Sequence, residues 1–249
     1  MNTFAGKVAL VTGGSSGIGR ATAVKFGERG ARVVVAARRE KEGEETVEMI
    51  KKAGGEAIFV QTDVRIASQV ENMVQQTVNK YGRIDIAFNN AGVGGIMARL
   101  VRTTEEIFDE LVDTNFKGVW LSMKYEIPVM QQQGGGAIVN NASISGVATA
   151  ERLAVYSASK HAVVGLSNAA ATEYGVDNIR VVAVCPGWIK THMTEELRAR
   201  EDAAMFQSMI PLKRWGEPEE AAEMVIWLAS DAASFVTGGA FIVSGGMNV

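Results

Sequence analysis

Tyr156 and Lys160 are two side chains whose types and spacing could do acid–base chemistry. They stand four residues apart, and on a helix this spacing places a phenol and an ammonium on one face. A free tyrosine has a pKa near ~10, but a neighbouring cation favours the phenolate. Lowering that pKa to about 7 requires roughly 3 units, or ~4 kcal/mol, which the ammonium and the positive ring of a cofactor could supply in a dry crevice. We interpret the pair as a tyrosine that exchanges a proton with a substrate.

Such a pair arises by chance on many helices, so the polar residues that accompany it matter. Ser143 ends an apolar run upstream of Tyr156 and could donate a hydrogen bond to a substrate oxygen. Asn115 lies in a stretch expected to be helical and could hold a water molecule. Together these side chains indicate proton transfer to a small molecule.

A glycine-rich loop, T-G-G-S-S-G-I-G over residues 12–19, follows an apolar run and precedes a helical pattern that starts at Arg20. Its glycines allow a sharp turn and the close approach of a pyrophosphate, whose charge is favoured by the helix N-terminus. A nucleotide-hydrolysing loop would need Lys and Ser or Thr where Arg20 and Ala21 stand. The loop predicts dinucleotide binding, and a tight turn without a ligand is the alternative.

The end of the second apolar run bears on which dinucleotide would bind. A carboxylate at this place selects NAD by accepting a hydrogen bond from the ribose 2′-hydroxyl. The run ends Ala36-Ala37-Arg38-Arg39, and the first acid comes only at Glu40. Two guanidinium groups are available for a 2′-phosphate. We therefore predict NADP(H) in preference to NAD(H), with two solvated surface arginines as the alternative.

The elements that must position these residues are short β-branched runs alternating with helical patterns. Most of the runs are apolar on both faces, as strands covered on two sides must be. This alternation predicts an α/β fold with one doubly wound parallel sheet and helices on both faces. The expected strands are 8–12, 33–36, 57–61, 84–88, 137–140, 181–185 and 241–243.

Helix signals and the lack of linkers organise the rest of the chain. Thr103 and Glu106 have the spacing of a capping box, and Pro218 stands just inside the start of an apolar helical stripe. No linker, repeat or low-complexity tract divides the chain, so we expect one domain over residues 1–249. Residues 187–216 form the least regular stretch, and we interpret them as a helical excursion that covers the substrate.

Composition argues against several other classes of function. The chain has 25 Lys and Arg against 28 Asp and Glu, a net charge of −3, which disfavours nucleic acid or an anionic membrane as partner. Two histidines and one cysteine form no cluster, so no metal is expected. Cys185 can form no intrachain disulfide, which agrees with a cytoplasmic location. We expect neither a signal peptide nor a membrane-spanning segment.

Taken in order along the whole chain, the motifs resemble the short-chain dehydrogenases/reductases, in the branch whose length matches this chain. The resemblance is carried by T-G-x-x-x-G-x-G at 12–19, Asp63, N-N-A-G at 89–92, Asn115, Ser143, Tyr156 with Lys160, and Pro186-Gly187-x-x-x-Thr191. It implies a Rossmann-like sheet of seven parallel strands, often in a homotetramer. It also implies hydride transfer between a nicotinamide cofactor and a small-molecule substrate.

The resemblance also implies roles for individual residues. Tyr156 would be the general acid/base, and Lys160 would bind the nicotinamide ribose and lower the pKa of Tyr156. Ser143 would orient the substrate oxygen, and Asn115 would support a proton-relay water. The implied cofactor-binding residues are Gly13, Ser15, Ser16, Gly17, Ile18, Gly19, Arg38, Arg39, Asp63, Val64, Asn90, Ala91, Gly92, Tyr156, Lys160, Pro186, Gly187, Ile189 and Thr191.

Apolar side chains in and near the excursion suggest an adaptable substrate pocket. The expected substrate contacts are Ile96, Ser145, Trp188 and Met193, with ordinary core or subunit-interface packing as the alternative. Ser16 stands where some NADP-selective relatives have a second basic residue, which places the cofactor preference at the modest end.

Two departures from the family pattern bear on the function. The final strand of the family usually continues into Asp-Gly-Gly, whereas this chain has Ser244-Gly245-Gly246, a change nearer the subunit interface than the chemistry. Acyl-carrier-protein ketoreductases of the family usually carry basic residues on two long interface helices, where this chain has Pro128 and Thr172. The general resemblance is closer to bacterial alcohol and diol dehydrogenases.

We therefore predict an NADP(H)-preferring oxidoreductase that acts on a secondary alcohol or its ketone. One alternative is a 3-oxoacyl-carrier-protein reductase. Another is a non-catalytic dinucleotide-binding regulator, which would be expected to have lost Tyr156, Lys160 or Ser143. A sugar-nucleotide epimerase would need a longer C-terminal substrate region.

Overall fold

The structure, a computed structural model, describes residues 3–149 and 151–247, and seven parallel strands within these ranges form one sheet. The strands are β1 Val8–Thr12, β2 Arg32–Ala37, β3 Glu56–Gln61, β4 Ile86–Asn89, β5 Gly136–Asn141, β6 Ile179–Pro186 and β7 Ala240–Val243. Every predicted run becomes a strand, with ends that move by at most two residues. The predicted doubly wound sheet is confirmed, and the predicted domain limits, 1 and 249, lie outside the described residues.

The strand order, β3-β2-β1-β4-β5-β6-β7, reverses direction between β1 and β4. In open α/β sheets a crevice forms at such a reversal, outside the carboxyl ends of the strands. The strand pleat explains why the runs are apolar on both faces, because alternate residues point to opposite sides. In β1, Val8 and Leu10 pack into one hydrophobic core, whereas Ala9 and Val11 pack into the other.

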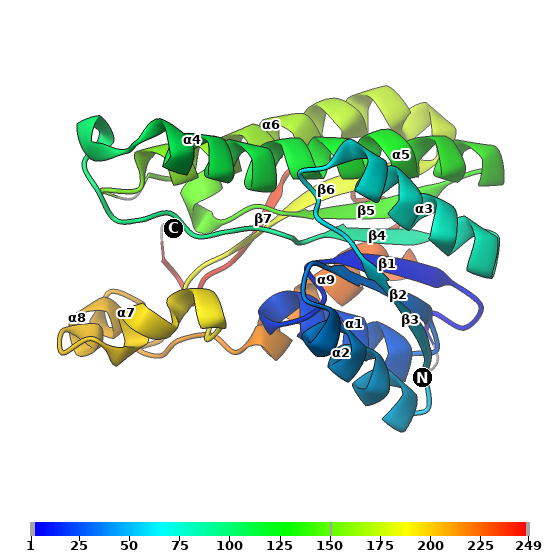
Figure 1. Cartoon of the computed structure of the whole chain (residues 1–249), viewed down its shortest axis with the longest axis horizontal. Helices are drawn as coiled ribbons and strands as arrows, with labels where there is room; N and C mark the ends of the chain where they lie inside the picture. The colour runs from blue at the N-terminus through cyan, green and yellow to red at the C-terminus, as the bar shows by residue number, and fades with distance from the viewer. Residues whose placement is uncertain (1–2, 150, 248–249) are drawn as a thin grey trace.

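Helices cover both faces of the sheet. They are α1 Gly17–Glu28, α2 Glu40–Lys52, α3 Ala67–Tyr81, α4 Glu105–Leu111, α5 Gly118–Gln133, α6 Ala154–Tyr174, α7 Glu195–Ala199, α8 Ala203–Ser208 and α9 Pro218–Ala229. Helices α3, α5 and α6 contribute to the core on one face, and α1, α2 and α9 to the core on the other (Figure 1). Within the described ranges no helix is long and apolar enough to cross a membrane.

The start of α4 differs from its prediction by one residue. Thr104, not Thr103, is the N-cap, and its side chain accepts a hydrogen bond from the Ile107 amide. A further hydrogen bond with Thr104 lowers the pKa of Glu106. Thr103 instead ends a 3-10 turn at Leu100–Arg102, so it lies one position too early to cap α4.

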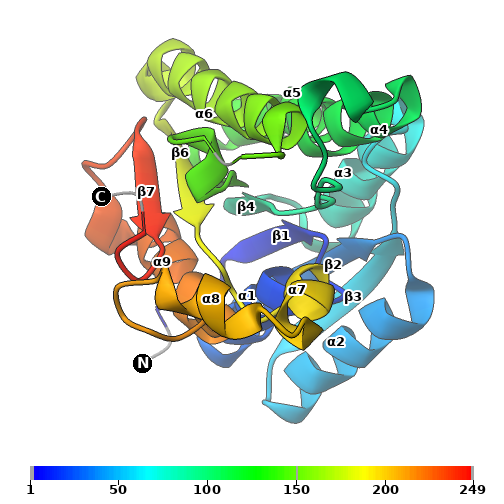
Figure 2. The same ribbon diagram turned by 90° about the vertical axis from the view of Figure 1, so that its left-hand side faces the viewer.

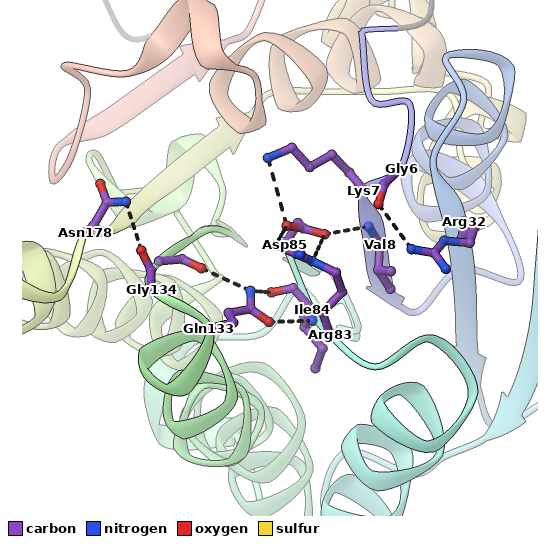
Figure 3. Close-up of polar contacts among 11 residues, drawn as sticks. Gly6, Lys7, Val8, Arg32, Arg83, Ile84, Asp85, Gln133, Gly134 and Asn178 are labelled. Atoms are coloured by element: carbon purple, nitrogen blue, oxygen red, sulfur yellow. Dashed lines mark hydrogen bonds and ion pairs between the residues drawn. The ribbon is translucent and has the colours of Figure 1, made fainter.

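Buried Asp85, which precedes β4, links the amino ends of β1 and β4 by hydrogen bonds (Figure 3). Its carboxylate accepts hydrogen bonds from the Val8 amide at 2.9 Å and from the Arg83 guanidinium at 2.7 and 2.9 Å. Gln133, the last residue of α5, accepts from the Ile84 amide at 3.1 Å and donates to the Ile84 carbonyl at 2.5 Å. These contacts hold the amino ends of β1 and β4 in register. Because the strands are parallel, their carboxyl ends then lie side by side at the other end of the sheet.

Helices α7 and α8 lie beyond the end of the sheet, at the left in Figure 1 and towards the viewer in Figure 2. They belong to the segment 187–216, whose base is closed by hydrogen bonds from Lys190 to Gly216 at 2.8 Å and from Gly216 to Trp188 at 3.0 Å. Within the segment, Trp188 stacks on Trp215 and meets the edge of Phe206, with ring centroids 5.3 and 5.4 Å away. The two tryptophans therefore form a small core for this excursion.

Candidate active site

A cavity of about 520 Å³ opens at the carboxyl ends of the strands, beside the β1–β4 reversal. Its volume is within the range of small-molecule and cofactor sites. Of the site residues predicted from the sequence, the cavity lining includes all except Gly19, Asp63, Val64, Ile96, Asn115, Ser145 and Trp188. The strand ends therefore bring most of the predicted site together.

The glycine loop after β1 is shaped to lie close against the loop after β4. Gly13 has a φ of +65°, and a Cβ there would lie 2.8 Å from the Ala91 Cα. A Cβ on Gly19 would lie 2.3 Å from the Gly13 carbonyl oxygen and 2.4 Å from the Asn90 amide nitrogen. Side chains at Gly13 and Gly19 would therefore push apart the two loops that line this part of the cavity.

The first turn of α1 presents open backbone donors. Its N-cap residue, Ser16, makes no side-chain capping bond with the described residues, and the turn contains no acidic side chain. Ser15, Gly17 and Ile18 line the cavity beside it. Since the first N–H groups of a helix lack intrahelical partners, this end suits an anionic group such as a pyrophosphate.

The two arginines after β2 are in different situations. Arg38 is exposed, lines the cavity and makes no side-chain hydrogen bond or ion pair with another described residue. Arg39 donates to the Ser16 hydroxyl at 3.0 Å and pairs with Glu42 at 3.3 Å. A guanidinium therefore lies against the glycine loop at Ser16, and a second one remains available.

Asn90 joins the ends of three strands. Its side-chain nitrogen donates to the carbonyl oxygens of Thr12 and Gly13 at 3.1 and 3.2 Å, and its oxygen accepts from Asn141 at 2.9 Å. The Thr12 hydroxyl in turn accepts from the Asn90 and Ala91 amides at 3.0 and 3.2 Å. The floor of the cavity is thus one hydrogen-bonded unit made from β1, β4 and β5.

Tyr156 and Lys160 lie one turn apart on α6, as their spacing predicted, and Ser143 follows the end of β5. Lys160 is buried, donates to the Asn141 carbonyl at 2.9 Å, and places its Nζ 5.9 Å from the centroid of the Tyr156 ring. Ser143 and Tyr156 line the cavity together with Lys160. A proton donor, a polar hydroxyl and an ammonium therefore share one wall of the cavity.

Asn115 lies in a π-helical segment, Val112–Lys117, that joins α4 to α5. Its amide accepts from the Val93 amide at 2.8 Å and donates to the Val93 carbonyl at 3.1 Å. It also donates to Ser159 at 3.3 Å, and Ser159 donates to the Tyr156 carbonyl at 2.7 Å. The side chain thus connects the loop after β4 to the helix that carries the tyrosine.

These residues fit a dinucleotide, because the glycine cradle and the open helix end lie at one part of the cavity and the buried ammonium at another. A family model described as "Enoyl-(Acyl carrier protein) reductase" matches residues 13–248. An uncharacterized oxidoreductase of Thermotoga maritima is 44% identical, with 98% of each chain covered. The cyclohexanol dehydrogenase of an Acinetobacter species is 40% identical over 98% of this chain and 96% of its own. The crystal structure of levodione reductase has a TM-score of 0.94 at 36% identity, covering 98% of both chains.

The chain belongs to the short-chain dehydrogenase/reductase family. Members of this family are oxidoreductases that bind nicotinamide dinucleotides and act on small molecules.

In this short-chain dehydrogenase/reductase, burial governs the ionisation of the tyrosine and lysine. Burial raises the pKa of Tyr156 above its ordinary value, and the hydrogen bond with Ser143 only opposes this. Burial also lowers the pKa of Lys160 to about 8. The lowered tyrosine pKa expected from the sequence is therefore not produced by the chain's own groups, because desolvation penalises both the phenolate and the ammonium.

Three of the predicted cofactor residues lie outside the lining for identifiable reasons. Asp63 is held by Arg65, whose guanidinium lies 2.6 Å from it and lowers the pKa of the carboxyl. Val64 is buried, and a Cβ on Gly118 would lie 2.7 Å from its side chain, so it belongs to the core. Gly19 lies in the first turn of α1 and packs against Gly13 and Asn90, so it faces these residues rather than the cavity.

The predicted substrate contacts are dispersed. Met193 lines the cavity, close to Gly94. Ser145 is buried and donates its amide to the Ser143 hydroxyl at 3.1 Å. Trp188 packs inside the excursion, and Ile96 is 65% exposed. Among these four, the structure therefore brings only Met193 into the lining of the cavity.

Asn141 is a lining residue that the sequence reasoning missed. It holds both Asn90 and Lys160, and it ends β5 as the second residue of an Asn-Asn pair. The signal was present, because β4 runs into an Asn-Asn pair as well, and the two strands are register partners.

Gly19→Ala should destabilise the protein and weaken dinucleotide binding, because the new methyl group would overlap the Gly13 carbonyl. Overpacking of this kind costs about 1–3 kcal/mol. Chemical denaturation and NADPH titration measure the two effects. The matched control is Gly165→Ala in α6, where a Cβ meets nothing within 4 Å and helix propensity predicts a gain of roughly 0.5–1 kcal/mol. Equal behaviour of the two variants would contradict the close approach of the loops.

Proposed function

We propose that this chain is an NADP(H)-preferring oxidoreductase that interconverts a secondary alcohol and its ketone, with Tyr156 as general acid/base. The observation that carries the proposal is the convergence of Tyr156, Ser143 and Lys160 on one wall of the cavity whose other end is the glycine cradle. When bound, the dinucleotide supplies or accepts the hydride.

The side chains divide the proton chemistry between them. The Ser143 oxygen accepts from the Ser145 amide, which orients the hydroxyl, and its own proton can be donated to Tyr156 or to a substrate oxygen. Tyr156 is protonated at neutral pH, since burial raises its pKa, and it can donate that proton as a ketone is reduced. In the opposite direction the nearby Lys160 ammonium stabilises the phenolate.

Lys160 and Asn115 support this exchange from opposite sides. With a pKa of about 8, Lys160 keeps its charge at neutral pH, and only one of its three N–H donors is used by Asn141. The other two donors can serve the ribose and the phenol. Asn115 fixes Val93 and Ser159, a positioning role beside the relay water that the family resemblance assigns to it.

The NADP(H) preference rests on Arg38, whose guanidinium makes no hydrogen bond or ion pair with the described residues, and on Ala37, which offers no acceptor to a 2′-hydroxyl. A charge-assisted contact with a 2′-phosphate contributes about 1.5–3 kcal/mol. Arg39, hydrogen-bonded to Ser16, adds positive charge beside the glycine loop.

The substrate is proposed to be a small neutral alcohol or ketone, with residues 187–216 as its cover. Relatives named cyclohexanol dehydrogenase and 2,5-dichloro-2,5-cyclohexadiene-1,4-diol dehydrogenase, each 40% identical, favour an alicyclic ring. A 3-oxoacyl-[acyl-carrier-protein] reductase of Thermotoga maritima is also 40% identical. Against that activity, Pro128 and Thr172 are exposed on α5 and α6, where carrier-protein reductases usually place bases.

We further propose a cytoplasmic homotetramer without nucleic-acid or membrane partners. The support for assembly is an apolar strip on α9 and after it, where Trp227 is 43% and Phe235 102% exposed, together with 37% exposed Ile242 on the edge strand β7. The net charge of −3 and the single buried cysteine support the remainder.

Tyr156→Phe should reduce kcat by roughly 10²–10⁴-fold, the usual contribution of a general acid. Cofactor affinity should remain nearly intact, because the ring still packs. Steady-state kinetics on a cyclic ketone and NADPH titration measure both quantities. Tyr174→Phe, at the other end of α6, is the control and should leave both unchanged. Full turnover by Tyr156→Phe would refute the catalytic role.

Arg38→Ile should lower kcat/KM for NADPH about ten- to a hundredfold without harming NADH, and adding Ala37→Asp should reverse the preference. The measurement is steady-state kinetics with both cofactors on one ketone. Arg39→Ile is the matched control, because Arg39 is already engaged by Ser16 and Glu42 and should matter less. Equal use of NADH by the unaltered protein would show that Arg38 makes no contact with a 2′-phosphate.

Light scattering should give a particle well above the 26.6 kDa of one chain. Phe235→Asp should shift it toward smaller species, because a charge would have to be desolvated at the interface. Val101→Asp, at an 87% exposed position outside the strip, should not. A 26.6 kDa particle from the unaltered protein at micromolar concentration would exclude the assembly.

A further inference from the structure

A buried polar cluster lies behind the cavity floor, on the side of the sheet covered by α5 and α6. It contains Glu126 of α5, which is 0% exposed, with Asn89 at the end of β4 and Asn140 in β5. Asn89 and Asn140 are register partners in adjacent strands. None of these side chains has a part in the proposed chemistry.

The hydrogen bonds of the cluster fix the orientation of each amide. Ser167 donates to the Val163 carbonyl at 2.7 Å, so its oxygen must accept from the Asn140 nitrogen, 2.9 Å away. The Asn140 oxygen therefore faces Asn89, whose nitrogen donates to it at 3.0 Å. The same Asn89 nitrogen donates to Glu126 Oε2 at 3.0 Å.

Two acceptor atoms on these bonded groups are left over. Asn89 Oδ1 and Glu126 Oε1 are both buried and have no partner among the described residues. An ionised carboxylate cannot donate, so it would leave both oxygens unsatisfied in a dry interior, which is costly. One proton on Glu126 makes its second oxygen a donor, and a carboxylic acid facing a carboxamide can then exchange two hydrogen bonds with it.

We propose that Glu126 carries a proton in the functional protein and is a positioning residue, its neutral carboxyl paired with the Asn89 carboxamide to set the carboxyl ends of β4 and β5. The next residues along the two strands are Asn90, which holds the glycine loop, and Asn141, whose carbonyl receives Lys160. The pair thus supports from behind the hydrogen bonds that shape the cavity floor. The effect of the pair on NADPH affinity rests on the proposed function, whereas the protonation of Glu126 does not.

The surroundings of Glu126 agree with this state. Burial raises its pKa to about 7, and the hydrogen bond from Asn89 opposes the rise. The buried titratable side chains on the elements that pack around α5 are Tyr81 on α3, Cys185 on β6 and Lys160 on α6, and buried Asp85 precedes β4. β4 and β5 carry no titratable group, and Lys124 and Tyr125 on α5 itself are not fully buried.

The direction of the pH effect follows from the raised pKa. Between the ordinary carboxyl pKa of 4.5 and about 7, the folded protein keeps a proton that the unfolded chain releases. The stability linked to Glu126 is therefore complete at low pH and is lost as the pH rises through about 7, after which it stays constant. Glu126→Gln supplies the same acceptor and a permanent donor to Asn89, so it should remove this dependence.

The experiment compares the unaltered protein with Glu126→Gln and Glu126→Leu, and with Ile127→Ala as the control. Ile127 is a buried neighbour on α5 outside the polar cluster, so its variant loses packing only. Thermal unfolding is measured at several pH values from about 5 to about 8, without cofactor. The dissociation constant of NADPH is measured over the same range, and infrared difference spectra against Glu126→Gln test for a protonated carboxyl near neutral pH.

Glu126→Gln should be as stable as the unaltered protein at low pH and increasingly more stable up to about pH 7. Its NADPH affinity should match at low pH and exceed that of the unaltered protein above about pH 7, by roughly two- to thirtyfold, the range of coupling through a supporting network. Glu126→Leu should lose affinity at every pH. Ile127→Ala should lose stability without any change in the pH profile.

A difference in stability between the unaltered protein and Glu126→Gln that stays constant from about pH 5 to about pH 8 would overturn the protonated pair. The protonated pair would also be overturned if Glu126→Gln lost stability and NADPH affinity as Glu126→Leu does, since a carboxylate would then be required. Unchanged NADPH affinity in Glu126→Leu would overturn the positioning role. Failure of the unaltered protein to bind NADPH at any pH would refute the proposed function instead, and the cofactor-free unfolding and infrared measurements would still decide the protonation of Glu126.

Discussion

The register of parallel strands at their carboxyl ends is the constraint on which this site depends. Asn90 donates to both Thr12 and Gly13 and accepts from Asn141, so a slip of one residue in β4 would break all three contacts, and a slip in β1 or β5 would break those with that strand. The same Asn141 presents the carbonyl that receives Lys160. The glycine loop and the Tyr156–Lys160 pair therefore depend on the same hydrogen-bonded strand ends, and the hydrogen bonds around Asp85 and Gln133 hold the strands in register at the other end of the sheet.

The surroundings of the site disfavour the charged forms of both Tyr156 and Lys160. Burial opposes both the Lys160 ammonium and the Tyr156 phenolate, so neither charge is stabilised by the fold alone. A protonated phenol beside a lysine with a pKa of about 8 suits donation of a proton at neutral pH. In the proposed reaction the reverse step needs positive charge close to the ring, and the Lys160 ammonium in the cavity wall is placed to supply it.

The strands and most of the cavity could be predicted because their signals are local. A β-branched run apolar on both faces allows few structures other than a covered parallel strand, and residues that follow such runs must gather at one edge. Three features were not predicted, for two different reasons. Thr104 rather than Thr103 caps α4, and Arg65 pairs with Asp63 from two residues away, so in both cases the choice lies between near neighbours whose signals are alike. Only the hydrogen bonds of Asn115 to Val93 are long-range contacts that no local signal could predict.

The pleat explains how one pair of strand ends can serve both faces of the sheet. Asn89 and Asn140 point to the α5 side, with Ala87 and Ile138 two residues earlier in the same core, whereas Asn90 and Asn141 point to the cavity. Two consecutive polar residues at the end of an apolar strand therefore build two networks, one dry and one open to a ligand. In the dry network every unpaired polar atom is costly, so the protonation state of Glu126 affects the positions of the strand ends. The network that faces the cavity is built on the same strand ends. The Asn-Asn pairs at the ends of β4 and β5 thus link the two faces of the sheet. On one face Glu126 accepts a hydrogen bond from Asn89, and on the other Lys160 donates one to the Asn141 carbonyl.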